Sequence, residues 1–129
     1  MESHGNERRK TAFRPDAKNV AESEAVLLIG LKGAEPLGLG CGACGYSTCS
    51  FLRRKAKTKA ELLRPVCAVR LLDMGIAIGS AVKMANLINV DNRIMYSIGV
   101  VTRALNMVDW DLVVGVALSA GGNSIYFDR

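Results

Sequence analysis

Four cysteines constrain this chain of 129 residues more than any other feature. They follow the pattern C-x2-C-x4-C-x17-C, and they are Cys41, Cys44, Cys49 and Cys67. Three thiols therefore belong to one short loop, and the fourth follows an intervening segment. A cubane iron–sulfur cluster has four metal corners, each of which takes one thiolate. The three-plus-one spacing predicts a [4Fe-4S] cluster with all four cysteines as its ligands.

Two other uses of these cysteines remain open. Structural zinc is also held by four thiolates, but such sites usually present two C-x2-C pairs, and this chain has only Cys41 with Cys44. A thiol redox pair is the other alternative. The spacing departs from the plant-type C-x4-C-x2-C order and from the compact bacterial ferredoxin run. Soft sulfur ligands suit iron–sulfur or zinc chemistry, and we prefer iron–sulfur.

The rest of the sequence indicates the cellular compartment that we expect for this protein. The segment from Met1 to Pro15 is polar and basic, without the apolar run of a secretory signal, so we expect a cytoplasmic protein. Structural disulfides are not expected in a reducing cytosol. The longest apolar stretch, Leu71 to Val90, is interrupted by Asp73, Lys83 and Asn86, which argues against a membrane span.

Half of the residues are hydrophobic, which is enough to form one core. We expect a flexible lead-in over residues 1–20 and an iron–sulfur domain over residues 21–129. The expected elements are a buried strand (25–31), a glycine-rich cysteine loop (33–45), a basic helix (48–64), a long buried helix (68–88), a turn (91–93), a helix (94–106) and a second strand (111–118). The fold class is therefore α/β or α+β, a small single domain with a short sheet, a buried central helix and a cluster loop.

Two glycines four residues apart, Gly75 and Gly79, lie within the expected central helix. Since neither carries a side chain, another backbone can approach this side of the helix closely. We therefore expect tight packing of the helix at these two positions.

The formal net charge of +5 is moderate, and its densest block follows the third cysteine: Arg53, Arg54, Lys55, Lys57 and Lys59. Such a block can steer an acidic redox partner toward the cluster, or can be a solvated helix face. It does not require a nucleic acid. The only histidine is His4, and no paired carboxylates or Ser/His/Asp set is apparent, so catalytic residues are not identified.

Several separated motifs resemble a family of small prokaryotic proteins of unknown function that contain a ferredoxin domain. The motifs are Gly38–Tyr46 with Cys49, Asp73–Val82, Asn89–Tyr96 and Ile125–Arg129. The cysteine spacing is also similar to the four-cysteine module of electron-transfer and corrinoid-protein subunits of anaerobes. That resemblance implies that Cys41, Cys44, Cys49 and Cys67 bind [4Fe-4S].

The motif Asp73–Ala77 with its following helix, together with the final strand, is similar to the core of nitroreductase-like flavoproteins. This resemblance implies FMN as a cofactor, although the matching residues include none that is specific for flavin. We predict an iron–sulfur protein that transfers electrons within or to a redox enzyme system. The alternatives are a zinc-stabilised interaction module and a nitroreductase-like flavin oxidoreductase subunit. The expected partners are an acidic redox protein or a second copy of the chain.

Overall fold

The computed structural model describes residues 13–32, 35–53 and 65–127. Its labelled elements are β1 (Ala25–Leu31), α2 (Cys49–Arg53), α3 (Ala68–Leu87), β2 (Asp91–Met95), α4 (Tyr96–Ala104) and β3 (Leu112–Ser119). A further helix covers residues 13–21. Three antiparallel strands and four helices in this part of the chain confirm the α+β class.

The sheet has the strand order β1-β3-β2, so the strand that comes last in the sequence lies in the centre. Leu28 of β1 and Met95 of β2 both pair with Gly115 of β3. Because side chains alternate along a strand, these three residues lie on the same face of the sheet. The continuous apolar run of β3 is buried along most of its length, as expected for a strand covered on both faces.

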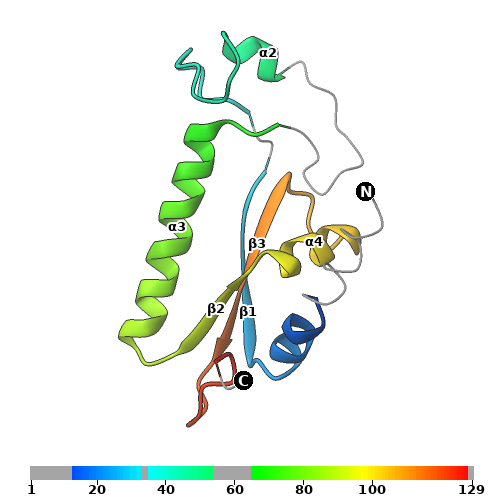
Figure 1. Cartoon of the computed structure of the whole chain (residues 1–129), viewed down its shortest axis with the longest axis vertical. Helices are drawn as coiled ribbons and strands as arrows, with labels where there is room; N and C mark the ends of the chain where they lie inside the picture. The colour runs from blue at the N-terminus through cyan, green and yellow to red at the C-terminus, as the bar shows by residue number, and fades with distance from the viewer. Residues whose placement is uncertain (1–12, 33–34, 54–64, 128–129) are drawn as a thin grey trace.

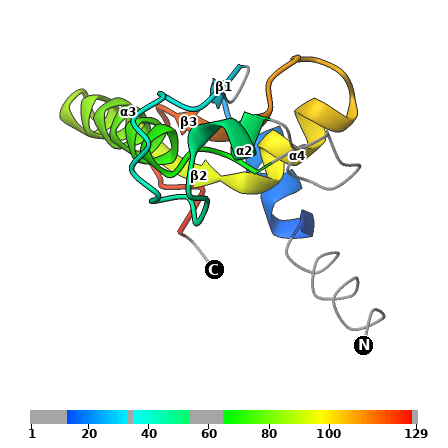
Figure 2. The ribbon, with the colours of Figure 1, turned by 90° about the horizontal axis from the view of Figure 1, so that it is seen from above.

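Helices cover the two faces of the sheet unequally. The helix α3 lies along one face, and α4 with the helix of residues 13–21 lies on the other (Figures 1 and 2). The loop before α2 and the N-terminal end of α3 meet at one end of the molecule (Figure 1). This three-layer arrangement puts the cysteine segment beyond the sheet.

The α4 face is closely packed because two glycines remove side chains where backbones approach. A Cβ on Gly99 of α4 would lie 1.8 Å from the carbonyl oxygen of Val113, and one on Gly115 would lie 2.3 Å from the side chain of Ile98. Around this contact Met95, Ile98, Ala117 and Tyr126 form a buried cluster. The main core therefore lies between the sheet and α4.

The expectation of a buried central helix is wrong. The bounds of α3 agree closely with the predicted helix, but only Met74 and Ala85 are buried within it. Nothing described lies within 4 Å of a Cβ built on Gly75 or Gly79, so the tight packing predicted there is absent among these residues. The helix is apolar on both sides, but the sheet covers only one.

The predicted turn at residues 91–93 is also wrong, because these residues begin β2. The chain reverses earlier, where Asn89 adopts a φ of 56° and the N–H of Val90 donates to the carbonyl of Ala85 at 2.9 Å. Asn92 donates to Asn86 Oδ1 at 2.7 Å, and Arg93 donates to the carbonyl of Tyr126 at 3.0 Å. These hydrogen bonds to residues outside the strand hold the polar residues Asn92 and Arg93 in β2.

The positions of the other predicted elements are confirmed where the structure describes them. The strand at 25–31 has the expected bounds, but its predicted burial is wrong, because its first three residues are exposed and the other four are only half-buried. The second strand and the helix before it are displaced by one or two residues at their ends. The predicted helix 48–64 is described only as α2, and the remainder lies outside the described residues. No helix in the described ranges is long and apolar enough to cross a membrane.

The ordered helix at residues 13–21 is a feature that the sequence analysis did not predict. Its Val20 packs against the core cluster, and the carbonyl of Asn19 accepts a hydrogen bond from Ser23 Oγ at 2.6 Å. Ser23 Oγ also lies 2.9 Å from the hydroxyl of Tyr126. Residues 1–12 lie outside the described part, and the division between residues 1–20 and 21–129 stays a prediction.

Candidate metal centre

A glycine-rich loop carries the first two cysteines and shapes the backbone around them. Gly42 and Gly45 both have positive φ, at 69° and 82°, and the N–H of Gly45 donates to the carbonyl of Gly42 at 2.9 Å. Residues with a side chain rarely adopt this conformation, so glycine permits the tight turn. Cys44 therefore lies inside a closed turn, and Cys41 lies exposed just before it.

The third cysteine begins α2 and is linked to the same loop. The backbone N–H of Gly40 donates to Cys49 Sγ at 3.3 Å. Leu52, one turn later, is only 2% exposed and anchors this short helix. The loop thus presents a backbone N–H donor to the third cysteine.

The fourth cysteine precedes α3 as its N-cap residue and is buried. The pKa of its thiol is lowered from the ordinary value, first by the backbone N–H of Arg70 and then by the backbone N–H of Leu37. Burial opposes this effect. The donor from Leu37 belongs to the cysteine loop, so Cys67 is the point where that loop meets α3.

Arg70, in the first turn of α3, completes this end of the molecule. Its charge is also the smallest of the causes that lower the pKa of Cys67. Its Nε is buried and has no hydrogen-bond partner among the residues that the structure describes. A buried donor without an acceptor is costly, and an anionic group at this end would relieve that cost. Sequence reasoning missed this residue, although its position three residues after Cys67 was a usable signal.

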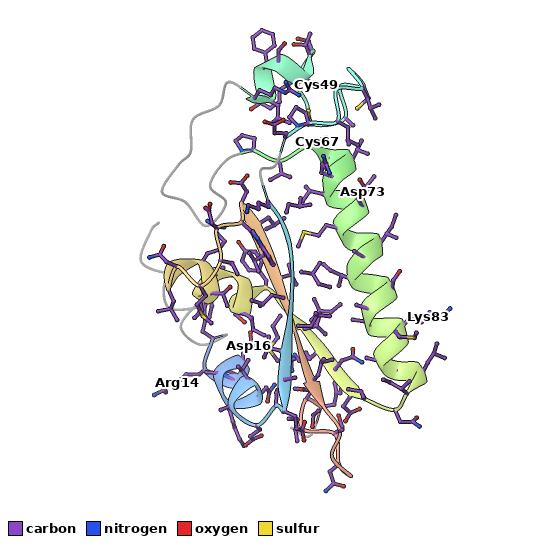
Figure 3. All side chains as sticks on the ribbon, turned by 180° about the vertical axis from the view of Figure 1, so that it is seen from behind. Arg14, Asp16, Cys49, Cys67, Asp73 and Lys83 are labelled. Carbon is purple, nitrogen blue, oxygen red and sulfur yellow. The ribbon has the colours of Figure 1, made fainter. Side chains whose placement is uncertain are left out.

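The structure brings the four predicted ligands to one end of the molecule but does not close a site around a metal ion. Figure 3 shows Cys49 and Cys67 beyond the sheet, at the end where α3 begins. No three Cys, His, Asp or Glu side chains within residues 13–32, 35–53 and 65–127 are grouped closely enough to hold a metal ion. The donor set fits a cluster chemically, since four thiols lie at this end together with backbone N–H groups and an arginine Nε that has no hydrogen-bond partner among the described residues.

Only the beginning of the basic block is described. Arg53 lies 3.8 Å from Glu35 in an exposed ion pair. Arg54, Lys55, Lys57 and Lys59 lie outside the described residues, so the cationic surface stays a prediction. A pair of this kind in water contributes little to stability.

A cavity of about 560 Å³ lies apart from the cysteines, between the helix of residues 13–21, β1 and α4. Its lining is mostly apolar, and Ser97 Oγ donates a hydrogen bond to Asp16 at its wall. The sequence analysis could not predict this cavity because it assigned residues 13–20 to a lead-in. Neither Asp16 nor Ser97 is a soft metal ligand, so this is not a second cluster site.

The structure is therefore a small α+β domain that carries the cysteine loop and Cys67 at one end. The chain belongs to a family whose model is described as "Uncharacterized protein containing a ferredoxin domain (DUF2148)", and the match covers residues 64–129. Of the four cysteines, only Cys67 lies in the matched range. The expectation that the other three cysteines are ligands therefore rests on their spacing and on the structure of the loop.

The chain is 47% identical over 117 residues to an uncharacterized protein of Archaeoglobus fulgidus. That match covers 91% of this chain and 64% of the relative, so the chain spans less than two thirds of the relative's length. No solved structure matches the chain.

Proposed function

We propose that this protein is an iron–sulfur protein that binds a [4Fe-4S] cluster through Cys41, Cys44, Cys49 and Cys67 and transfers electrons. The observation that carries the proposal is that the cysteine loop lies at the N-terminal end of α3, where Cys67 is buried and the backbone N–H of Leu37 helps to lower the pKa of its thiol. Membership of a ferredoxin-domain family supports the same chemistry.

Each part of the site has a separate task in this proposal. A bound [4Fe-4S] cluster would accept and release one electron at a time. The first turn of α3 lowers the pKa of Cys67, and Cys49 accepts the N–H of Gly40. The glycines let the loop adopt a tight path around a bulky group. The positive charge of the half-buried Arg70 would offset the negative charge of the thiolates and favour the reduced state.

The proposed partner is a redox protein in the cytoplasm with an acidic surface. The cysteine loop is largely exposed, so an acceptor can approach the site closely. The cationic segment after Cys49 would steer such an acceptor by long-range attraction.

The test is anaerobic purification followed by analysis of iron, sulfide and zinc, with electron paramagnetic resonance of the reduced protein. We expect about four iron and four sulfide per chain in the wild type. Replacing Cys41, which is exposed, by serine should lower the iron content to a fraction of that value without unfolding the sheet. Cys67→Ser should also lower the iron content, but because Cys67 is buried this change can destabilise the fold as well.

Ser47→Ala is the matched control, because it changes an exposed residue of the same loop and leaves every thiol in place. It should keep the wild-type iron content and spectrum. A colourless wild-type protein with one zinc per chain would overturn the iron–sulfur proposal. A Cys41→Ser protein with unchanged iron, sulfide and spectrum would show that the proposed set of four ligands is wrong.

A further inference from the structure

The outward side of α3 is an apolar surface that no described part of the chain covers. Leu72, Ile76 and Leu87 are each 68% exposed, and they follow one another along the side of α3 that faces away from the sheet. Figures 1 and 2 show α3 at one side of the molecule, with the sheet against its other side only. A helix that is apolar all round is normally buried on all sides.

The length of α3 makes this surface large enough to act as a contact. Its 20 residues span about 30 Å at 1.5 Å per residue. Met84, which is 62% exposed, extends the apolar surface toward the C-terminal end of α3. Exposed apolar surface of this extent is a typical mark of a protein interface.

The charges of α3 indicate what covers it. Apart from Arg70 near the cysteines, the helix carries only Asp73 and Lys83, which both project from it in Figure 3. Neither forms an ion pair with another described residue. Asp73 precedes Ile78 by five residues and Lys83 follows it by five. The two opposite charges are therefore placed symmetrically about the middle of the helix.

We propose that the outward side of α3 binds the same side of α3 in a second copy of this chain, with the two helices antiparallel about a twofold axis at Ile78. Asp73 of each copy is then level with Lys83 of the other, which makes two equivalent ion pairs. A parallel pair would instead place like charges together. Twofold contacts between identical surfaces are the commonest form of protein assembly.

The same register brings Leu72 level with Met84, so that two exposed apolar side chains of α3 lie at the same height in the contact. No described atom lies within 4 Å of a Cβ built on Gly75 or Gly79, so a second helix can approach closely there. The antiparallel arrangement puts the two cysteine ends at opposite ends of the contact, about 30 Å apart.

The test is sedimentation equilibrium of the complete, cluster-loaded chain over a range of concentrations, combined with exchange of the two charges. We expect a dimer in the wild type. Asp73→Lys alone and Lys83→Asp alone should each weaken dimerisation about tenfold or more at low salt, because each creates like-charge contacts. The double variant Asp73→Lys with Lys83→Asp should restore wild-type dimerisation.

Both charges lie on an exposed helix surface, so the variants should keep the wild-type circular dichroism and iron content. If the wild-type chain stayed monomeric at about 100 µM, a concentration well above the Kd of ordinary complexes, the proposal would be wrong. The same holds if the monomeric chain instead bound a different polypeptide. A dimer that is insensitive to the three charge variants would also overturn it, since the contact would then lie elsewhere.

Discussion

The two faces of the sheet are covered by helices of opposite character. On one face Gly99 brings α4 against the backbone of β3, and Met95, Ile98, Ala117 and Tyr126 form a buried cluster around that contact. On the other face Gly75 and Gly79 of α3 point into open space. Glycine therefore lies at a close backbone contact on one face, whereas on the other face no described neighbour packs against it.

The difference shows that glycine spacing in a helix predicts a close approach but not its partner. Gly99 needs no Cβ because the carbonyl of Val113 occupies that space. Gly75 and Gly79 meet no such neighbour within the described chain, so their proposed partner comes from another molecule. Stability should therefore depend strongly on the α4 face, whereas assembly should depend on the α3 face.

The largest expected effect comes from placing a methyl group into the closed face. Gly99→Ala should destabilise the protein by about 3 kcal/mol or more, because the new Cβ would overlap a backbone atom that cannot move freely. Urea denaturation followed by circular dichroism measures this change.

Gly75→Ala is the matched control on the open face. Alanine favours the helix by about 1 kcal/mol over glycine, and the added methyl group meets no described neighbour, so stability should rise. If Gly99→Ala were as stable as the wild type, the contrast between the two faces would be wrong.

An intermediate effect is expected at the N-terminal end of α3, the polar part of the α3 face. Replacing Arg70 by glutamine removes a cation beside Cys67, which should lower the reduction potential of the cluster by roughly 50 mV, close to a tenfold change in a one-electron couple. A redox titration followed by electron paramagnetic resonance measures the potential.

Arg70→Lys keeps the charge and should recover most of the wild-type potential. If the glutamine variant instead titrated at the wild-type potential with full iron content, the guanidinium would have no electrostatic role toward the cluster.

The smallest effect is expected at Glu24, just before β1, at the end of the sheet away from the cysteines. Its carboxylate accepts the N–H of Ala120 at 3.1 Å. The pKa of Glu24 is lowered, first by a backbone hydrogen bond at Glu24 itself and then by those from Ser119 and Ala120. Since the folded pKa lies below the unfolded value of about 4.3, the stabilisation is present above that pH and is lost as the pH falls through the folded value.

Glu24→Gln should therefore melt slightly below the wild type at pH 7, and the difference in Tm should shrink as the pH is lowered toward 3. Glu22→Gln is the control, because Glu22 forms only an exposed pair with Lys18 at 3.8 Å. A difference in Tm that stays constant with pH would assign the effect of Glu24→Gln to something other than the carboxylate.

The sequence was most informative about the bounds of regular elements. The apolar run from Ala25 to Leu31 forms β1 with the expected bounds, although the strand is not buried as that run predicted. The length of α3 was also predictable, but its burial was not, because apolar residues on two sides of a helix do not say which side its own chain will cover. Asp91 begins a strand despite its preference for turns, since pairing with Ser119 outweighs local propensity.

For the candidate site, spacing predicted which cysteines gather, and the structure places the described loop and Cys67 at one end. The unpaired Nε of Arg70 depends on how one side chain packs, which no sequence pattern specifies. The cavity near Asp16 requires three segments distant in sequence to come together, so it too lay beyond local reasoning.

The central position of β3 also sets an order of events during synthesis. β1 and β2 each pair only with β3, which is made after both. At about 5 to 20 residues per second, roughly 4 to 16 s separate the end of β1 from the start of β3 on the ribosome. During that interval the apolar strand β1 has no partner strand, whereas Cys41, Cys44, Cys49 and Cys67 have all been made. A nascent chain can therefore present its complete set of thiols before its sheet exists.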